Sequence, residues 1–445
     1  MEKWYLDISS YIREHEQQIV SDLMNLVRVP SVAKHGADGL PFGREVDNLL
    51  VAAAELFARD GFAMHISHEK GYALAVFDGE GDGIGIFAHG DVVPVGDDWV
   101  KTKPFEPLLQ NGVLYGRGVI DNKCAIIEAL YALRALKAAG VKIDSRVTVY
   151  VGGCEEAGMQ DIQAFAEHER MPAVSIVPDG SFPVVVGEKS LLRVTCRSKE
   201  KLKNVVKFHG GEVYNTVLDH VDVQLSDGSA FFVEGVPSHA ANPKASVNAG
   251  CEAVKKLLEM PICDEDKEIL SVFTNGIEKY NGEDFGIASE GAQGKLTCAN
   301  GIVYLDNGHL VFTLDIRCGI EYSLACCIDD LRRSLGDKGF TMEVDEQSTG
   351  YLMDASSKEV VIIRGACNEV MGTPDAMPVK MAGATYARML KNAYPIENTP
   401  KPWPEDGGGA HKRDEAACVE SILKATEYIA LIIARLDAHL TGKME

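Results

Sequence analysis

Three stretches in the first half of the chain place apolar residues at helical spacing. Residues 1–29 and about 43–60 have this pattern, and the second stretch stops at Gly61. Residues 122–140, "NKCAIIEALYALRALKAAG", have it most strongly, and Gly140 stands where the residue after a helix end would. The pattern therefore predicts three helices in this part of the chain.

Short, mostly apolar segments lie between and after these predicted helices. They are typical of strands, and they cover residues 72–78, 83–89, 146–153 and 173–178. A Gly/Asp turn joins the first two, and a helical stretch separates the last two. Strands that alternate with helices favour an α/β fold with a mixed, mostly parallel sheet.

The pattern changes near residue 187. Segments such as "SLLRVTCRS" and "HLVFTLDIRCGI" are typical of half-buried strands, and "ASVNAGCEAVKKLLEM" is typical of a helix between them. This α+β pattern runs to about residue 350, after which the chain returns to helix and loop and ends in a strong helix. We expect one domain inserted into another, with residues 1–186 and 351–445 forming the first and 187–350 the insert.

Composition narrows the class of protein. The chain has 445 residues, which is long for one core, and a formal net charge of −22, which argues against nucleic acid or an anionic membrane as partner. It has 11 cysteines, an odd number that fits free thiols in a reducing compartment. We see no signal peptide and no apolar run long enough to span a bilayer, so we expect a cytoplasmic protein.

Residues typical of metal sites follow three of the predicted strands. His89 and Asp91 follow the second strand, Glu155 and Glu156 the third, and Asp179 the fourth. In open α/β sheets, ligands bind beyond the carboxyl ends of the strands, so these side chains are expected to share one crevice. Two further residues can join them, Asp121 at the start of the long helix and His411 after the loop "PEDGGGAHK".

The set has the composition of a two-metal site. Two metal ions need one bridging carboxylate and terminal ligands on each side, and zinc accepts imidazole and carboxylate together. Five residues can supply these ligands: His89, Asp121, Glu156, Asp179 and His411. Asp91 can accept the second N–H of the His89 ring, which leaves Glu155 to take a proton from metal-bound water and later donate it to a leaving amine.

Each residue also has an ordinary interpretation when it is taken alone. Asp121 is a candidate helix cap, the paired glutamates a solvated pair, Asp179 part of a turn and His411 a loop residue. The glycines at 407–409 are not followed by the Lys-Ser/Thr of a phosphate loop. Metal-type residues at three strand ends favour the metal site over these separate interpretations.

Several longer motifs contain or accompany these residues. They include "HGDVVPVGDDW", "PFEPLLQNGVLYGRGVIDNK", "CEEAG", "PDGSFPVVVGEKS", "VPSHAANPKASVNA", "GGEVYNTV" and "GATYARML". Together they resemble the motifs of the M20 family of metallopeptidases, most of all those of its PepV-like branch of bacterial dipeptidases. The resemblance implies a centre of two divalent metal ions, usually zinc, with manganese or cobalt as alternatives. Asp121 would bridge the two ions; the resemblance assigns His89 and Asp179 to one, and Glu156 and His411 to the other.

The resemblance also implies roles for other residues. Asp91 would orient His89, and Glu155 would be the general base for attack by metal-activated water. In the inserted lid, His239 and Asn215 would contact the scissile carbonyl, and Arg317 could meet a substrate carboxylate. Thr385, in "GATYARML", would also contact the substrate.

The sequence departs from the family pattern at a few positions. Asn122 and Cys124 stand where Asp and Gly are usual, and Ser190, Ser246 and Ala384 replace expected glycines. None of these changes removes a metal ligand or the general base. Cys124 lies in the first turn of the predicted helix, where a thiolate is favoured, so we expect sensitivity to thiol oxidation, with a buried filler role as the alternative.

These features predict a metallo-dipeptidase that hydrolyses the peptide bond of small peptides. The alternatives are an N-acyl-amino-acid or desuccinylase-type amidohydrolase with the same metals, and a peptide-binding protein without catalysis. The insert has the size of a domain, and the resemblance implies that a lid of this length supplies the histidine within one chain. We therefore expect His239 to act within its own chain and the enzyme to work as a monomer, with a dimer as the alternative.

Overall fold

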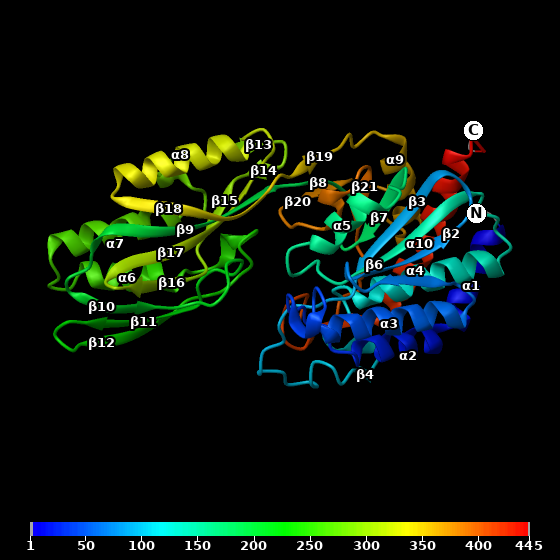
Figure 1. Cartoon of the computed structure of the whole chain (residues 1–445), viewed down its shortest axis with the longest axis horizontal. Helices are drawn as coiled ribbons and strands as arrows, with labels where there is room; N and C mark the ends of the chain where they lie inside the picture. The colour runs from blue at the N-terminus through cyan, green and yellow to red at the C-terminus, as the bar shows by residue number, and fades with distance from the viewer. Residues whose placement is uncertain (1–2, 444–445) are drawn as a thin grey trace. The chain divides into compact units, whose positions relative to one another are not determined.

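A computed structural model describes residues 3–443, which fold into two compact units (Figure 1). Unit 1 comprises the residues up to Val186, the segment Asp354–Val379 and the residues from Thr385 onward. Unit 2 comprises Gly187–Met353 and the short segment Lys380–Ala384. The sequence pattern gave no sign of this second, short excursion of the chain into unit 2.

A six-stranded sheet with the order β1-β2-β6-β3-β7-β21 forms the centre of unit 1. Its four strands β6, β3, β7 and β21 run parallel, and β1 and β2 extend it in antiparallel fashion. The strands are β1 (Met64–Ser67), β2 (Tyr72–Phe77), β3 (Glu80–His89), β6 (Ser145–Gly152), β7 (Val174–Pro178) and β21 (Ala393–Ile396). The predicted mixed, mostly parallel sheet is therefore confirmed, and β21 is a strand that the sequence pattern missed.

The helices of unit 1 are α1 (Lys3–Glu14), α2 (Glu16–Val27), α3 (Arg44–Arg59), α4 (Lys123–Ala138), α5 (Gln160–His168), α9 (Lys358–Met371) and α10 (Val419–Leu440). The long apolar helices α4 and α10 pack on each other and on β3. Phe165 of α5 joins an aromatic cluster with Phe87 of β3 and Tyr150 of β6. These packed layers hold the strand ends in fixed positions.

The prediction of one helix over 1–29 is wrong for the residues that the structure describes. The chain leaves the helical conformation at His15, which has φ −101° and ψ 10°. The imidazole ring of His15 stacks on the ring of Tyr11. Both resulting helices pack on α4, but α1 also packs on α10 whereas α2 also packs on α3. Residues 1–2 of the predicted helix lie outside the described part.

Unit 2 is an antiparallel α+β unit. Its larger sheet has the order β15-β17-β9-β18 with β16 paired to β17, and its smaller sheet has the order β10-β11-β12. The strands are β9 (Ser190–Lys201), β10 (Val205–His209), β11 (His220–Leu225), β12 (Ala230–Glu234), β15 (Thr297–Ala299), β16 (Val303–Asp306), β17 (His309–Cys318) and β18 (Phe340–Ser348). Helices α6 (Ala249–Leu258), α7 (Asp264–Ile277) and α8 (Leu324–Asp337) share one apolar core with both sheets.

Shorter elements complete the fold. Unit 1 has a small sheet of β4 (Leu108–Gln110), β5 (Val113–Tyr115) and β22 (Ala416–Cys418), and the 3-10 helices η1 (Ala37–Gly39) and η4 (Tyr386–Met389). Unit 2 has the strands β13 (Glu290–Gly291) and β14 (Gly294–Lys295), and the 3-10 helices η2 (Pro243–Ala245) and η3 (Glu283–Phe285). Strands β8 (Val185–Glu188), β19 (Tyr351–Leu352) and β20 (Val379–Met381) lie where the chain passes between the units. Among residues 3–443, no helix combines the length and apolar character needed to cross a membrane.

Candidate metal centre

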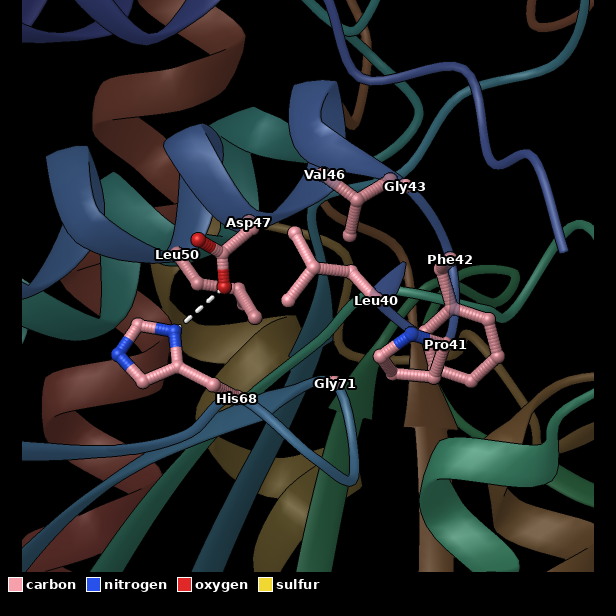
Figure 2. A pocket seen from close by; sticks show the side chains of 9 residues that line it. All are labelled: Leu40, Pro41, Phe42, Gly43, Val46, Asp47, Leu50, His68 and Gly71. Carbon is pink, nitrogen blue, oxygen red and sulfur yellow. Dashed lines mark hydrogen bonds and ion pairs between the residues drawn. The ribbon is translucent and has the colours of Figure 1, made fainter. Parts of the chain in front are cut away.

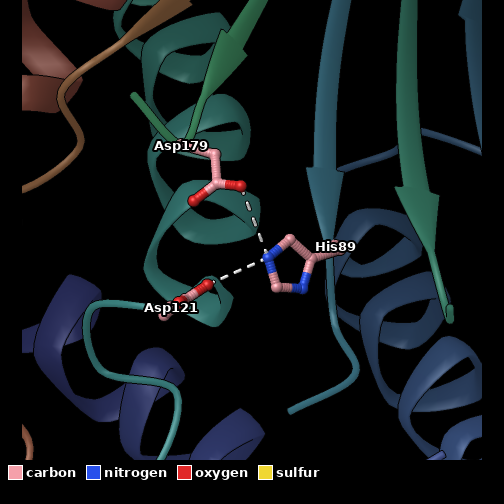
Figure 3. Close-up of side chains that lie close together, drawn as sticks. All are labelled: His89, Asp121 and Asp179. Carbon is pink, nitrogen blue, oxygen red and sulfur yellow. Dashed lines mark ion pairs between the residues drawn. The ribbon is translucent and has the colours of Figure 1, made fainter. Parts of the chain in front are cut away.

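The carboxyl ends of three neighbouring parallel strands bring candidate ligands together. His89 is the last residue of β3, and Asp179 directly follows β7. Glu155 and Glu156 lie in the turn beyond β6. Since β6, β3 and β7 are adjacent in the sheet, these side chains converge at one edge, as Figure 3 shows for His89 and Asp179.

Asp121 lies between two histidines and offers one oxygen to each. Its Oδ1 is 3.0 Å from Nε2 of His89, and its Oδ2 is 3.0 Å from Nε2 of His411. Asp179 Oδ2 is 3.7 Å from the His89 Nε2, and Glu156 Oε1 is 2.9 Å from the His411 Nε2. The side chains thus form two groups, each with ligand atoms within 4.8 Å of one another, and Asp121 belongs to both. Figure 3 shows the first group, which consists of His89, Asp121 and Asp179.

Asp121 is not a helix cap. Helix α4 begins at Lys123, its N-cap residue is Asn122, and no side chain caps it. The pairing of β5 with β22 instead sets the loop before Asp121 beside Glu415, which directly precedes β22. The carboxylate Oε1 of Glu415 accepts hydrogen bonds from the backbone N–H groups of Gly118, Ile120 and Asp121, at 3.1, 2.8 and 3.1 Å. The sequence pattern did not single out Glu415.

Asp91 has more contacts than the sequence predicts. The Nδ1 atom of His89 lies 3.0 Å from the backbone carbonyl oxygen of Asp91 and 3.4 Å from its carboxylate Oδ1. The two carboxylate oxygens accept the backbone N–H groups of Glu155 and Glu156, each at 3.0 Å. Asp91 therefore orients both the His89 ring and the turn that carries the two glutamates.

Asn122 connects the ends of two strands. Its Oδ1 accepts the backbone N–H of His89 at 3.3 Å, and its Nδ2 donates to the carbonyl oxygen of Pro178 at 2.6 Å. The same Nδ2 lies 3.4 Å from Oδ1 of Asp179. The sequence shows Asn122 only as a departure from a motif. Its role could not be predicted, because His89, Pro178 and Asp179 come near it only in the folded protein.

Burial and the crowding of carboxyl groups shift the pKa values of several residues in the site. Burial raises the pKa of Glu155 well above its usual range, and burial likewise raises the pKa of Asp179. Burial lowers the pKa of His411, but the close carboxylates of Asp121 and Glu156 outweigh this effect and raise the pKa to about 11. Carboxylates crowded in this way favour the binding of cations.

The donor set fits divalent metal ions. The buried atoms His89 Nε2, Glu155 Oε1 and Glu156 Oε1 lack hydrogen bonds of ordinary geometry among the described residues. Imidazole nitrogen and carboxylate oxygen together suit zinc and similar ions, and a carboxylate with one oxygen on each side suits a bridging position. Glu155 belongs to neither group of candidate ligands.

Two predicted site residues of unit 2 lie side by side. Thr216 and His239 form an antiparallel bridge, and the backbone carbonyl of Asn215 accepts the N–H of Ala240 at 2.8 Å. Nδ1 of His239 accepts the backbone N–H of Ala241 at 3.1 Å, which assigns the proton of the neutral ring to Nε2. Asn215 and His239 are thus brought together within unit 2.

Arg317 and Thr385 have partners that the sequence did not predict. The Nε and Nη2 atoms of Arg317 donate to the carboxylate of Asp315 at 2.6 and 3.0 Å, and Nη1 donates to the carbonyl of Ala382 at 3.1 Å. The fork expected to meet a substrate carboxylate is therefore occupied by Asp315. Thr385 is buried, and its hydroxyl accepts the N–H of Ala387 as the N-cap of η4.

The expectation of a favoured Cys124 thiolate is wrong. The side chain is buried, and burial raises the pKa of the thiol well above its usual value. The nearby carboxylates of Glu128 and Glu415 raise it further. Desolvation and nearby negative charge disfavour the Cys124 thiolate more than the N-terminal turn of α4 stabilises it.

Comparisons with known proteins agree with this architecture. The family described as "Peptidase family M20/M25/M40" matches residues 85–435. A Staphylococcus aureus protein named "Putative dipeptidase" is 27% identical over 428 residues, covering 85% of this chain and 89% of that protein.

Solved structures share the fold of the whole chain. The di-peptidase Dug1p of Saccharomyces cerevisiae has a TM-score of 0.65 at 12% identity, covering 98% of this chain and 99% of its own. Human carnosine dipeptidase 1 has a TM-score of 0.65 at 14% identity, with coverage of 98% and 99%. The family match spans most of the chain, which therefore belongs to peptidase family M20/M25/M40, a family of hydrolases.

Proposed function

We propose that this chain is a metallopeptidase that hydrolyses the peptide bond of dipeptides at a centre of two divalent metal ions. The observation that carries the proposal is the position of Asp121, whose two oxygens face two separate groups of ligands. In this proposal His89 and Asp179 hold one ion, Glu156 and His411 hold the other, and Asp121 is shared. The chemistry that such ions supply when bound is polarisation of a carbonyl group and acidification of water.

Glu155 is the general base in this proposal. The residue is half-buried next to Glu156 in the chain, and its Oε1 is buried without a hydrogen bond of ordinary geometry among the described residues. A carboxylate in this position takes a proton from the attacking water and donates it to the leaving amine. Asp91 supports this role because its carboxylate fixes the backbone N–H of Glu155 and its backbone carbonyl faces the His89 ring.

His239 and Asn215 are the proposed substrate contacts of unit 2. A proton on Nε2 of His239 suits a donor to a carbonyl oxygen on which negative charge develops. Arg317 and Thr385 stay predictions for substrate binding. Arg317 would have to exchange its ion pair with Asp315 for one with a substrate carboxylate.

We further propose zinc as the metal, with manganese or cobalt as alternatives, and a monomeric enzyme in the cytoplasm. The mixed imidazole and carboxylate donor set supports zinc. The 11 cysteines of the chain are all free, which is consistent with a reducing compartment. A monomer is sufficient for activity if His239 acts within its own chain, as we predict.

The experiment that tests the proposed function is a substrate panel. The metal-loaded enzyme is assayed with dipeptides, tripeptides and N-acyl amino acids, and the Glu155→Gln variant serves as the control for contaminating hydrolases. We expect the highest kcat/KM with dipeptides, at least tenfold above the other two classes. A preference for N-acyl amino acids would instead identify an amidohydrolase, and binding of peptides without turnover would identify a non-catalytic binding protein.

A further inference from the structure

The turn that carries Glu155 and Glu156 is fixed through four successive backbone N–H groups. Those of Gly153 and Cys154 donate to Oδ2 of Asp161, at 2.8 and 3.0 Å. Those of Glu155 and Glu156 donate to the two carboxylate oxygens of Asp91, each at 3.0 Å. Two buried carboxylates from different parts of the chain thus set the course of the backbone at the proposed general base.

Asp161 is in turn held by a tyrosine from a distant segment. The hydroxyl of Tyr386 donates to Oδ2 of Asp161, and the backbone N–H of Ile162 donates to its Oδ1 at 2.8 Å. Tyr386 is buried, and its ring meets the rings of Tyr150 and His89 edge to face, with centroids 5.5 and 6.2 Å apart. It belongs to the "TYAR" segment, to which the proposed function assigns no role beyond the predicted substrate contact of Thr385.

The packing around this turn leaves little room for it to move. A Cβ atom at Gly152 would lie 2.0 Å from the Tyr386 hydroxyl, and a Cβ atom at Gly153 would lie 2.4 Å from Cγ1 of Val46. Val46 lines a small hollow with Phe42 and Gly71, and Figure 2 shows these residues around it. Because neither glycine has a side chain, Tyr386 can pack closely against Gly152 and Val46 against Gly153.

We propose that Tyr386 is a positioning residue that acts through Asp161 to hold Glu155 in place for proton transfer. This inference rests on the proposed role of Glu155 as general base. Without the tyrosine hydroxyl, Asp161 loses a charge-assisted hydrogen bond, and the N–H groups of Gly153 and Cys154 lose a fixed acceptor. Because proton transfer depends steeply on geometry, displacements on the order of 1 Å can cost about 10²-fold in rate.

Tyr386→Phe tests the inference because it removes one hydroxyl and keeps the packed ring. We expect kcat on the best dipeptide to fall at least tenfold, while KM and the number of bound metal ions stay within twofold of the wild type. Asp161→Asn, which keeps Tyr386, should lower kcat in the same way. The metal content is measured independently of activity, so it separates misplacement of Glu155 from loss of ligands.

Tyr131→Phe is the matched control. The buried Tyr131 also donates to a buried aspartate, Asp22, at 2.7 Å, but it lies on α4 away from the turn. We expect Tyr131→Phe to lose about as much thermal stability as Tyr386→Phe does, but to keep the kcat of the wild type. A kcat of Tyr386→Phe equal to that of Tyr131→Phe, or a loss of metal from Tyr386→Phe, would overturn the inference.

The failure of this inference can be distinguished from the failure of the proposed function. If Glu155→Gln keeps its activity, the proposed general base is wrong, and with it the role of Tyr386. If Glu155→Gln is inactive while Tyr386→Phe and Asp161→Asn both keep normal kcat, only the role of Tyr386 is wrong.

Discussion

At the scale of single residues, the paired glutamates beyond β6 have different surroundings although they are neighbours in the chain. Oε1 of Glu156 lies 2.9 Å from Nε2 of His411 within one group of candidate ligands, whereas Glu155 belongs to neither group. The backbone N–H groups of both are fixed by Asp91. This difference supports a metal ligand at Glu156 and a proton-transfer group at Glu155.

Glu155→Ala should therefore abolish turnover and leave the metal content nearly intact. Proton transfer by a positioned residue is typically worth ~10²–10⁴-fold in rate. The measurement is kcat together with elemental analysis of the purified variant, with Glu156→Ala as the comparison that should lose metal. Loss of metal from a folded Glu155→Ala protein would mean that the two glutamates have exchanged roles.

A second residue-scale prediction concerns Glu128 on α4. Neither of its buried carboxyl oxygens has a hydrogen bond of ordinary geometry among the described residues. Burial raises its pKa well above the usual value, the charge of Glu397 raises it further, and the Cys124 thiol partly opposes the shift. The folded protein therefore keeps this proton at a pH where the unfolded chain, with an ordinary pKa of about 4.3, has lost it.

The sign of the pH dependence follows from this difference. As the pH rises above about 4.3, Glu128 makes the folded state progressively less stable, by about 1.4 kcal/mol per pH unit while it stays protonated. Glu128→Gln has no such loss, so its stability relative to wild type should increase between pH 5.5 and 8. Urea unfolding of both proteins at these two values measures the difference. A constant or shrinking difference would contradict the raised pKa.

At the scale of elements, Asn122 connects β3, β7 and the start of α4. Its amide accepts a hydrogen bond from the backbone of His89 and donates one to the backbone of Pro178, which precedes Asp179. Two proposed ligands of the same ion therefore depend on one side chain for their relative position. Such outer partners typically contribute 10–100-fold to metal affinity.

Asn122→Ala should accordingly weaken metal binding by roughly 10–100-fold. Competition with a chelator of known affinity measures the metal dissociation constants of the variant and the wild type. Asn300→Ala is a matched control, because the buried amide of Asn300 also donates to backbone carbonyls, those of Ile302 and Thr313, but within unit 2. Equal metal affinity in the two variants would show that Asn122 has no special part in the site.

The sequence predicted the elements whose pattern is strong and missed those fixed by tertiary contacts. The strands ending at His89 and Pro178 and the helix α4 have clear periodicity, and they place most of the candidate ligands. Strand β21 is only four residues long and contains Pro395, so it becomes recognisable only beside β7. The ion pair of Arg317 with Asp315 is different, because it joins two residues on the same side of β17 and is therefore a local contact that the strand pattern could have indicated.

At the scale of the whole molecule, the proposed function draws on residues of both units. The candidate metal ligands and Glu155 belong to unit 1, and His239 belongs to unit 2. Unit 2 has its own apolar core and is as large as an independent domain. We therefore predict that His239 serves the site of its own chain.

A complementation assay tests this prediction. Inactive Glu155→Ala protein and inactive His239→Ala protein are mixed under conditions that exchange subunits, and the mixture should stay inactive. His239→Ala alone should mainly lower kcat, because a donor to the developing oxyanion is worth ~10²–10³-fold. Recovery of activity in the mixture would show that the histidine comes from a second chain.

If two metal ions share Asp121, the fully active enzyme must hold two ions per chain. Metal-free enzyme is titrated with zinc, and bound metal and dipeptidase activity are followed together. We expect full activity at two equivalents per chain, and Asp121→Ala should fail to retain either ion tightly. Full activity of the wild-type enzyme with one equivalent or less would contradict the two-metal centre.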